Sequence, residues 1–180
     1  MGASDFAERI VIGMNYPQEL LDYWADTNAR VTSGEAQEWP ASKETVSRYK
    51  RHLEKLKPIA DAGNDLAKYA IASIYHLELI YPDEATLEQR YSEDRATMTQ
   101  LLFQCAENGM VIAFDNRVTS GVGEIADSAR AAAREYDRIQ KPDWDEPCNM
   151  PVYTPQWMEG AMNLWRTRLR EQEGGHDDSS

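Results

Sequence analysis

The segment IADAGNDLAKYAIASIY, residues 59–75, constrains the fold more than any other part of the sequence. Apolar residues recur at spacings of three and four on both sides of Gly63, which is the spacing of an amphipathic helix. Gly63 has no Cβ, so it can end a helix in the left-handed conformation at little cost. Asn64 or Asp65 then offers a side-chain oxygen that caps the next helix. The segment therefore predicts a tight antiparallel hairpin of two helices.

The rest of the chain carries further helix signals and few strand signals. Pro17 and Ser42 are suited to open the two helices that precede Gly63, and Pro82 stops the helix that follows it. Apolar periodicity predicts more helices, the first capped by Ser92 and the last starting at Pro155. We therefore expect an all-α fold built from antiparallel helical hairpins.

Two segments of the chain resemble a known repeat. Residues 59–75 resemble the core of a Sel1-like repeat, a relative of the tetratricopeptide repeat, in which an Ala-x-x-Gly turn joins two helices. LLFQCAENGMVIAF, residues 101–114, is similar to a second copy. Its Gly109 lies 46 positions after Gly63, and this period is in the range of helical repeats. The chain departs from the family after Tyr75, where the Gly-rich loop is missing. Over about residues 53–136 the resemblance implies a short α-solenoid (Sel1/TPR-like) with flanking helices and a role in binding other proteins.

Length and charge limit the classes of function. The 180 residues suit one domain, which we expect over 1–173, followed by a disordered polar tail over 174–180. The net charge of −12 argues against direct binding of nucleic acid and suits a basic protein partner. We find neither a membrane-spanning apolar run nor a signal-peptide pattern. We expect a soluble cytoplasmic protein, or a periplasmic one if a signal peptide has been removed; the oligomeric state stays open.

Motifs for catalysis are incomplete. His76 and Glu78, with Cys148 further on, match part of the zinc-deaminase signature, but Pro151 stands where the second cysteine ligand belongs. A nucleophile pair of Cys148 with His52 or His76 has no local support. Phosphate-binding and dinucleotide-binding loops are missing from the sequence. We predict no catalytic residue, no metal and no cofactor.

Acidic segments that contain an aromatic residue are the best candidates for an interface. Residues 41–60 carry a net charge of +4, whereas residues 82–94 and 143–147 read as acidic loops around Tyr91 and Trp144. Aromatic side chains contribute strongly to interface energy, and charges steer the encounter. Trp24, Trp157, Trp165 and Cys105 are expected in the core instead. The predicted partner-binding residues are Trp39, Glu88, Tyr91, Asp94, Asp143, Trp144, Asp145 and Glu146.

Together these features predict a non-catalytic module that binds a basic protein. A bacterial or phage inhibitor, an immunity protein and a small adaptor all fit this description. Two alternatives stay open at this point. The first is an acidic nucleic-acid mimic that blocks a DNA- or RNA-binding protein. The second is an enzyme with an unrecognised site that includes His76 and Cys148.

Overall fold

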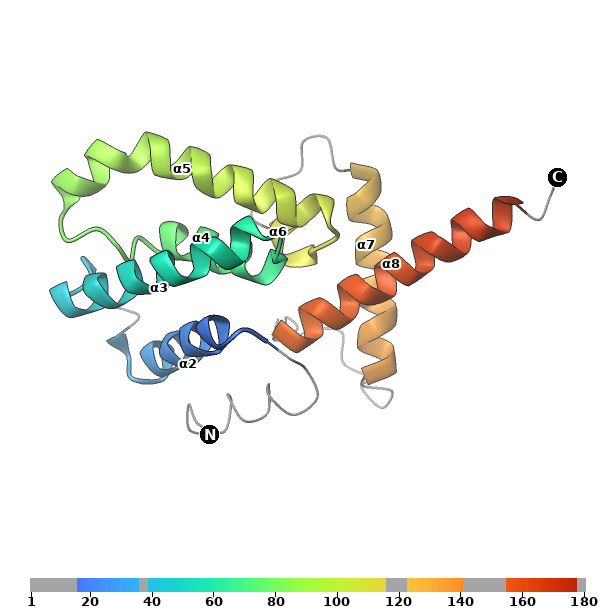
Figure 1. Cartoon of the computed structure of the whole chain (residues 1–180), viewed down its shortest axis with the longest axis horizontal. Helices are drawn as coiled ribbons and strands as arrows, with labels where there is room; N and C mark the ends of the chain where they lie inside the picture. The colour runs from blue at the N-terminus through green and yellow to red at the C-terminus, as the bar shows by residue number, and fades with distance from the viewer. Residues whose placement is uncertain (1–15, 36–38, 116–122, 141–154, 178–180) are drawn as a thin grey trace. The chain divides into compact units, whose positions relative to one another are not determined.

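The computed structural model describes residues 16–35, 39–115, 123–140 and 155–177, and within these ranges it contains seven α-helices and no strand (Figure 1). The predicted all-α class is confirmed. In the described part of the chain, no helix is long and apolar enough to span a membrane. The helices are α2 (Gln18–Thr32), α3 (Lys43–Asp61), α4 (Asp65–His76), α5 (Glu84–Glu107), α6 (Val111–Asp115), α7 (Gly123–Gln140) and α8 (Pro155–Asp177).

Helices α3 and α4 form the hairpin predicted from Gly63. Gly63 has a φ of 101°, and its N–H donates to the carbonyl of Ala60 at 2.9 Å. The N–H of Asn64 donates to the carbonyl of Ile59 at 3.3 Å, which completes a Schellman motif. The side chain of Asn64 then accepts a hydrogen bond from the N–H of Ala67 at 3.0 Å. The glycine thus ends α3 and the asparagine caps α4, as the sequence predicts.

The chain divides into two compact units, residues 1–102 and residues 103–180, with the boundary inside α5. The single domain expected over 1–173 stays a prediction. In unit 1, α3 packs along α4, and α2 contacts both (Figure 1). In unit 2, α7 packs along α8, and α6 contacts α7.

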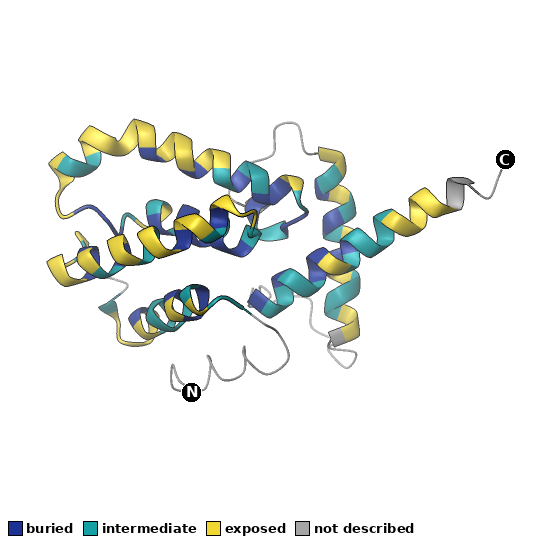
Figure 2. Cartoon of the chain, in the orientation of Figure 1, coloured by how far each residue is buried: buried dark blue, intermediate teal, exposed yellow. Residues whose placement is uncertain are grey.

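Each unit buries its own set of apolar side chains (Figure 2). Unit 1 fully buries large side chains of α2, α3 and α4, and complete burial of one such side chain stabilises a fold by about 1.5–3 kcal/mol. Cys105 and Trp165 are buried in unit 2 as predicted, whereas Trp24 and Trp157 are only partly buried. The core of unit 1 includes Leu20, Tyr49, Leu56, Ala67, Ala70 and Ile74, and that of unit 2 includes Ala126, Ala129, Ala132, Ala133, Met158, Ala161 and Met162.

Helix α5 begins earlier than the sequence pattern predicts. The segment expected as an acidic loop over 82–94 is helical from Glu84 onward. Asp83 caps this helix, because its Oδ1 accepts a hydrogen bond from the N–H of Thr86 at 2.7 Å. Ser92 therefore lies inside the helix and is not its cap. At the other end of the chain, α8 continues to Asp177, so the start of the expected disordered tail is helical.

The turn at Gly109 repeats the geometry of the turn at Gly63. Gly109 has a φ of 84°, and the N–H groups of Gly109 and Met110 donate to the carbonyls of Ala106 and Cys105 at 3.0 and 3.1 Å. The following helix α6 has only five residues, and its main contacts are with α7. The second copy is thus shorter than a full hairpin, and solenoid stacking stays a prediction.

Candidate functional site

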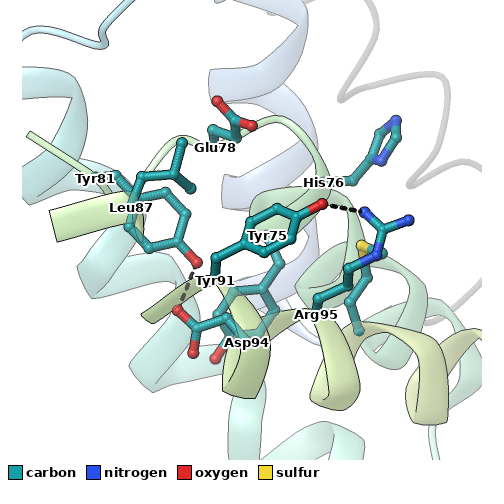
Figure 3. A pocket seen from close by; sticks show the side chains of 9 residues that line it. Tyr75, His76, Glu78, Tyr81, Leu87, Tyr91, Asp94 and Arg95 are labelled. Atoms are coloured by element: carbon teal, nitrogen blue, oxygen red, sulfur yellow. Dashed lines mark hydrogen bonds between the residues drawn. The ribbon is translucent and has the colours of Figure 1, made fainter. Parts of the chain in front are cut away.

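A hollow of about 160 Å³ lies in unit 1, where the turn after α4 meets the first half of α5 (Figure 3). It is smaller than the roughly 300–1,000 Å³ typical of sites for small-molecule ligands, and it suits a single side chain better. Three tyrosines, two acidic residues and an arginine are among its walls. The lining residues are Tyr75, His76, Glu78, Tyr81, Leu87, Tyr91, Asp94, Arg95 and Met98.

Glu78 occupies a backbone position that favours glycine. Its φ is 57°, its N–H donates to the carbonyl of Tyr75 at 3.2 Å, and the N–H of Leu79 donates to the carbonyl of Ile74 at 3.3 Å. This is the same Schellman motif that Gly63 forms after α3. A residue with a Cβ is disfavoured in this conformation by roughly 1 kcal/mol. Residues held in such conformations cluster at functional sites.

The side chain of Glu78 holds an exposed tryptophan. The indole Nε1–H of Trp39 donates to Oε2 of Glu78 at 2.8 Å, while 55% of Trp39 stays exposed. Leu77, beside Glu78 in the chain, and Tyr91, which lines the hollow, are also exposed, by 44% and 47%. Trp39, Leu77 and Tyr91 are three of the five large hydrophobic side chains that the described residues expose. We call Trp39, Leu77, Glu78 and Tyr91 the Glu78 surface.

Asp94 lines the hollow from within the fold. It is only 4% exposed and accepts hydrogen bonds from the Tyr81 hydroxyl at 2.5 Å and from Nε of Arg90 at 3.3 Å. Burial, and then the hydrogen bond to Asp94, raise the pKa of the Tyr81 phenol, so this hydroxyl keeps its proton and donates. Asp94 thus supports the wall of the hollow. Its oxygens have hydrogen-bond partners within the chain, and its predicted role in partner binding stays a prediction.

Tyr91 already binds a cation of its own chain. Nη1 of Arg95 donates to the Tyr91 hydroxyl at 2.9 Å, and the guanidinium carbon lies 5.5 Å from the centre of the Tyr91 ring. The two residues are four positions apart on α5, where side chains of a helix meet. Both side chains are exposed, and Figure 3 shows them at the edge of the hollow. The tyrosine ring is therefore oriented to accept a positive group.

The structure brings together only part of the predicted binding set. Trp39 donates a hydrogen bond to Glu78, and Tyr91 lines the same hollow as Glu78, whereas Glu88 is exposed on α5 and does not line the hollow. Sequence reasoning missed Glu78 as a site residue; the signal for it was the missing glycine after Tyr75. The remaining predicted residues lie outside the described ranges: Asp143, Trp144, Asp145 and Glu146.

A polar cluster between α2 and α3 is a second concentration of titratable groups among the described residues of unit 1. Asp26 accepts hydrogen bonds from Nε of Arg48 at 3.2 Å and is 2.7 Å from Nε2 of His52. The second acid of the cluster, Glu35, has a lowered pKa because Thr45 and then Arg48 donate hydrogen bonds to it. Arg48, one of the basic residues of α3, thus uses its charge within the fold. These bonds fasten α2 to α3, and Cys148, the nucleophile considered for His52, is outside the described ranges.

Comparisons with protein-family models, with curated proteins and with solved structures find no match for this chain. The Sel1-like assignment therefore stays a prediction that depends on residues 59–75. Among the described residues, no group of three or more His, Cys, Asp or Glu side chains could hold a metal ion. The function has to be inferred from the geometry of the Glu78 surface and the hollow.

Proposed function

We propose that this chain is a protein-binding module and that the Glu78 surface, with the adjoining hollow, docks a basic segment of a partner protein. The observation that carries the proposal is the pairing of Glu78 with Trp39. A strained residue orients an aromatic side chain that stays more than half exposed. Such an arrangement adds little to the stability of the chain alone, and an interface would use it.

The exposed aromatic side chains favour protein binding over catalysis. Tryptophan and tyrosine are the residues most enriched among those that dominate binding energy, because each offers a large apolar area with a polar group at its edge. Trp39, which is hydrogen-bonded to Glu78, and Tyr91, which lines the hollow together with Glu78, provide two such groups. The hollow is of a size for one side chain of a partner.

The local charge favours a basic partner. Residues 78–95 contain six acidic residues and two arginines, a net charge of −4 within a chain of net charge −12. Such a surface attracts a basic protein over a distance of about 8–10 Å at physiological salt. Arg90 and Arg95 interrupt the acidic face of α5. A mimic of nucleic acid would present only negative charges along such a face. The two arginines therefore support the protein-binding proposal over a mimic.

The test compares the wild-type chain with a surface variant. Trp39→Ala combined with Tyr91→Ala removes both exposed aromatic groups, and Ile139→Ala, an exposed apolar residue of unit 2, is the matched control. Proteins that co-purify with the wild type are identified, purified and titrated against all three proteins. We expect saturable binding that weakens at least about 30-fold in the double variant, as loss of two aromatic anchors implies.

Two results would overturn the proposal. One is a purified partner that binds the double variant as tightly as the wild type, because the interface would then lie elsewhere. The other is the absence of any saturable protein partner. Circular dichroism and thermal melting of all three proteins establish that the variants are folded. A partner with a net negative charge would contradict the electrostatic part of the proposal.

A further inference from the structure

The hollow beside Glu78 has the chemistry of a receptor for one cationic side chain. We propose that it binds an arginine side chain of the basic partner, and that Arg95 of this chain holds the place of that arginine until the partner arrives. This inference rests on the proposed function, since it names the group that the docking surface recognises. It goes further by identifying the subsite and its internal competitor.

The first support is the aromatic lining. Tyr75, Tyr81 and Tyr91 line a hollow of about 160 Å³, and the face of an aromatic ring attracts a positive charge. Burial raises the pKa of the Tyr75 phenol, as it does for Tyr81, so these hydroxyls stay neutral and able to accept or donate hydrogen bonds. A guanidinium group, which is planar and weakly hydrated, stacks on aromatic rings more readily than an ammonium group.

The second support is the acidic component. Glu78 is one of the residues that line the hollow, and its Oε2 accepts the hydrogen bond from the indole of Trp39. Asp94 adds a second acidic group beneath the tyrosines, although its oxygens are engaged by Tyr81 and Arg90. A cation placed in the hollow would therefore meet Glu78 as its main charged partner.

The third support is that a guanidinium already uses one wall of this site. Arg95 lies 5.5 Å from the ring centre of Tyr91 and donates to the hydroxyl of the same residue at 2.9 Å. Both residues are exposed, so the contact is held weakly and can exchange. An incoming arginine would replace Arg95 over Tyr91, and Arg95 would move into solvent. Arg95 thus acts as an intramolecular competitor that lowers the affinity of the site.

The test uses short peptides as probes and needs no knowledge of the partner. Acetyl-Gly-Arg-Gly-amide is titrated into the whole chain and followed by NMR at the methyl group of Met98, which lines the hollow. The matched ligand is the citrulline peptide, which has nearly the same shape without the charge. Acetyl-Gly-Glu-Gly-amide tests the opposite charge. We expect shifts of Met98 with the arginine peptide and much smaller ones with the other two.

Two substitutions with opposite expected effects make the test specific. Arg95→Ala empties the site and should strengthen binding of the arginine peptide by about 3–10-fold, the range expected for one cation–π contact and one charge. Tyr91→Ala removes the ring and should weaken binding by about 2–5-fold. Lys50→Ala removes an exposed positive charge on α3 and is the control for net charge alone. We expect it to change the affinity much less than Arg95→Ala does.

Several outcomes would overturn the inference. Equal binding of the arginine and citrulline peptides would mean that charge is not recognised, and preferential binding of the glutamate peptide would identify an anion site. If Arg95→Ala and Lys50→Ala strengthened binding of the arginine peptide equally, net charge alone would explain the effect, and Arg95 would not be a competitor. A lack of shift at Met98 in the wild type and in Arg95→Ala would exclude the subsite. The two proposals can fail separately. If Met98 does not shift but a purified partner still loses affinity when Trp39 is replaced, the arginine subsite is excluded and the docking surface is retained.

Discussion

Glu78 accepts a hydrogen bond from the indole of Trp39 while its own backbone adopts a φ of 57°, a conformation that glycine would adopt with less strain. Helices α3 and α5 end in the same motif with Gly63 and Gly109 at the equivalent position. Among the described residues, Glu78 is the one with a side chain that has a positive φ. The chain thus accepts backbone strain at a helix end where a carboxylate orients an exposed aromatic group.

The strain at Glu78 can be measured with two substitutions at the same position. Glu78→Gly and Glu78→Ala both remove the carboxylate that binds Trp39, but only alanine keeps a Cβ in the left-handed conformation. We expect the free energy of unfolding of Glu78→Gly to exceed that of Glu78→Ala by about 1 kcal/mol. Urea denaturation of the two variants gives this difference directly. Equal stability would show that the backbone at residue 78 is not strained.

Gly109 and Gly63 should respond differently to the same change. An added Cβ at Gly109 would overlap the ring of Trp165, whereas a Cβ at Gly63 would meet nothing within 4 Å. Both glycines have positive φ, so alanine costs backbone energy of roughly 1 kcal/mol at either site. We expect Gly109→Ala to cost about 2–4 kcal/mol in total because the tightly packed ring has to move.

Thermal and urea unfolding of the two alanine variants test this difference. The exposed turn at Gly63 serves as the control for backbone strain alone. A loss of stability in Gly109→Ala no larger than that in Gly63→Ala would contradict the packing of Trp165 against the turn. Fluorescence of the tryptophans at low denaturant would report any shift of the ring.

The Tyr81 phenol should make stability depend on alkaline pH. Its pKa is raised in the fold by burial and by the hydrogen bond to Asp94, while the unfolded value is about 10. Below about pH 10 both states hold the proton, so the contribution of this group is present in full. As the pH rises further, the unfolded chain releases the proton and the folded chain retains it, so the free energy of unfolding falls.

Tyr81→Phe should make this fall less steep, since one group contributes up to about 1.4 kcal/mol per pH unit. The measurement is urea unfolding of both proteins at several pH values on either side of about pH 10. The slope is the readout, because loss of packing alone would shift the curve without changing its steepness. Identical slopes for the wild type and the variant would contradict the assignment.

The polar cluster between α2 and α3 should contribute more than the ion pair between α7 and α8. Asp26→Ala removes the acceptor of both Arg48 and His52 in a partly buried setting, and we expect a loss of about 1–3 kcal/mol. Arg168→Ala removes a more exposed ion pair with Glu135, and we expect a smaller loss because solvent screens this pair. Urea denaturation of both variants provides the comparison. A larger loss from Arg168→Ala would reverse the ranking by burial.

The parts of the fold that depend on local signals could be predicted from the sequence. Gly63 ends a helix, Asn64 caps one, and Ser42 caps another by accepting from the N–H of Thr45, because each effect involves residues within a few positions. The start of α5 was available from the same rule, since Asp83 and Thr86 have the spacing of a cap. The acidic character of the segment masked this signal.

The candidate site depends on contacts that no local pattern contains. Trp39 and Glu78 are 39 positions apart, and Asp94 is buried because Tyr81 reaches it from the turn after α4. From the sequence alone, an acidic residue on a polar helix is predicted to be exposed, because the side chain that covers it is not known. The division of the contacts into two units within α5 also depends on tertiary contacts, which no local sequence pattern contains.

Within unit 1, helix α5 is only thinly covered. Of its residues up to Leu102, only Asp94, Met98 and Leu102 are buried. Segments with few tertiary contacts open at lower free energy than the rest of a fold. The amide hydrogens in the first half of α5 should therefore exchange with solvent sooner than those of α3 and α4. Because each opening dismantles the tyrosine-lined hollow, protection of these amides in a mixture would reveal an occupant before its identity is known.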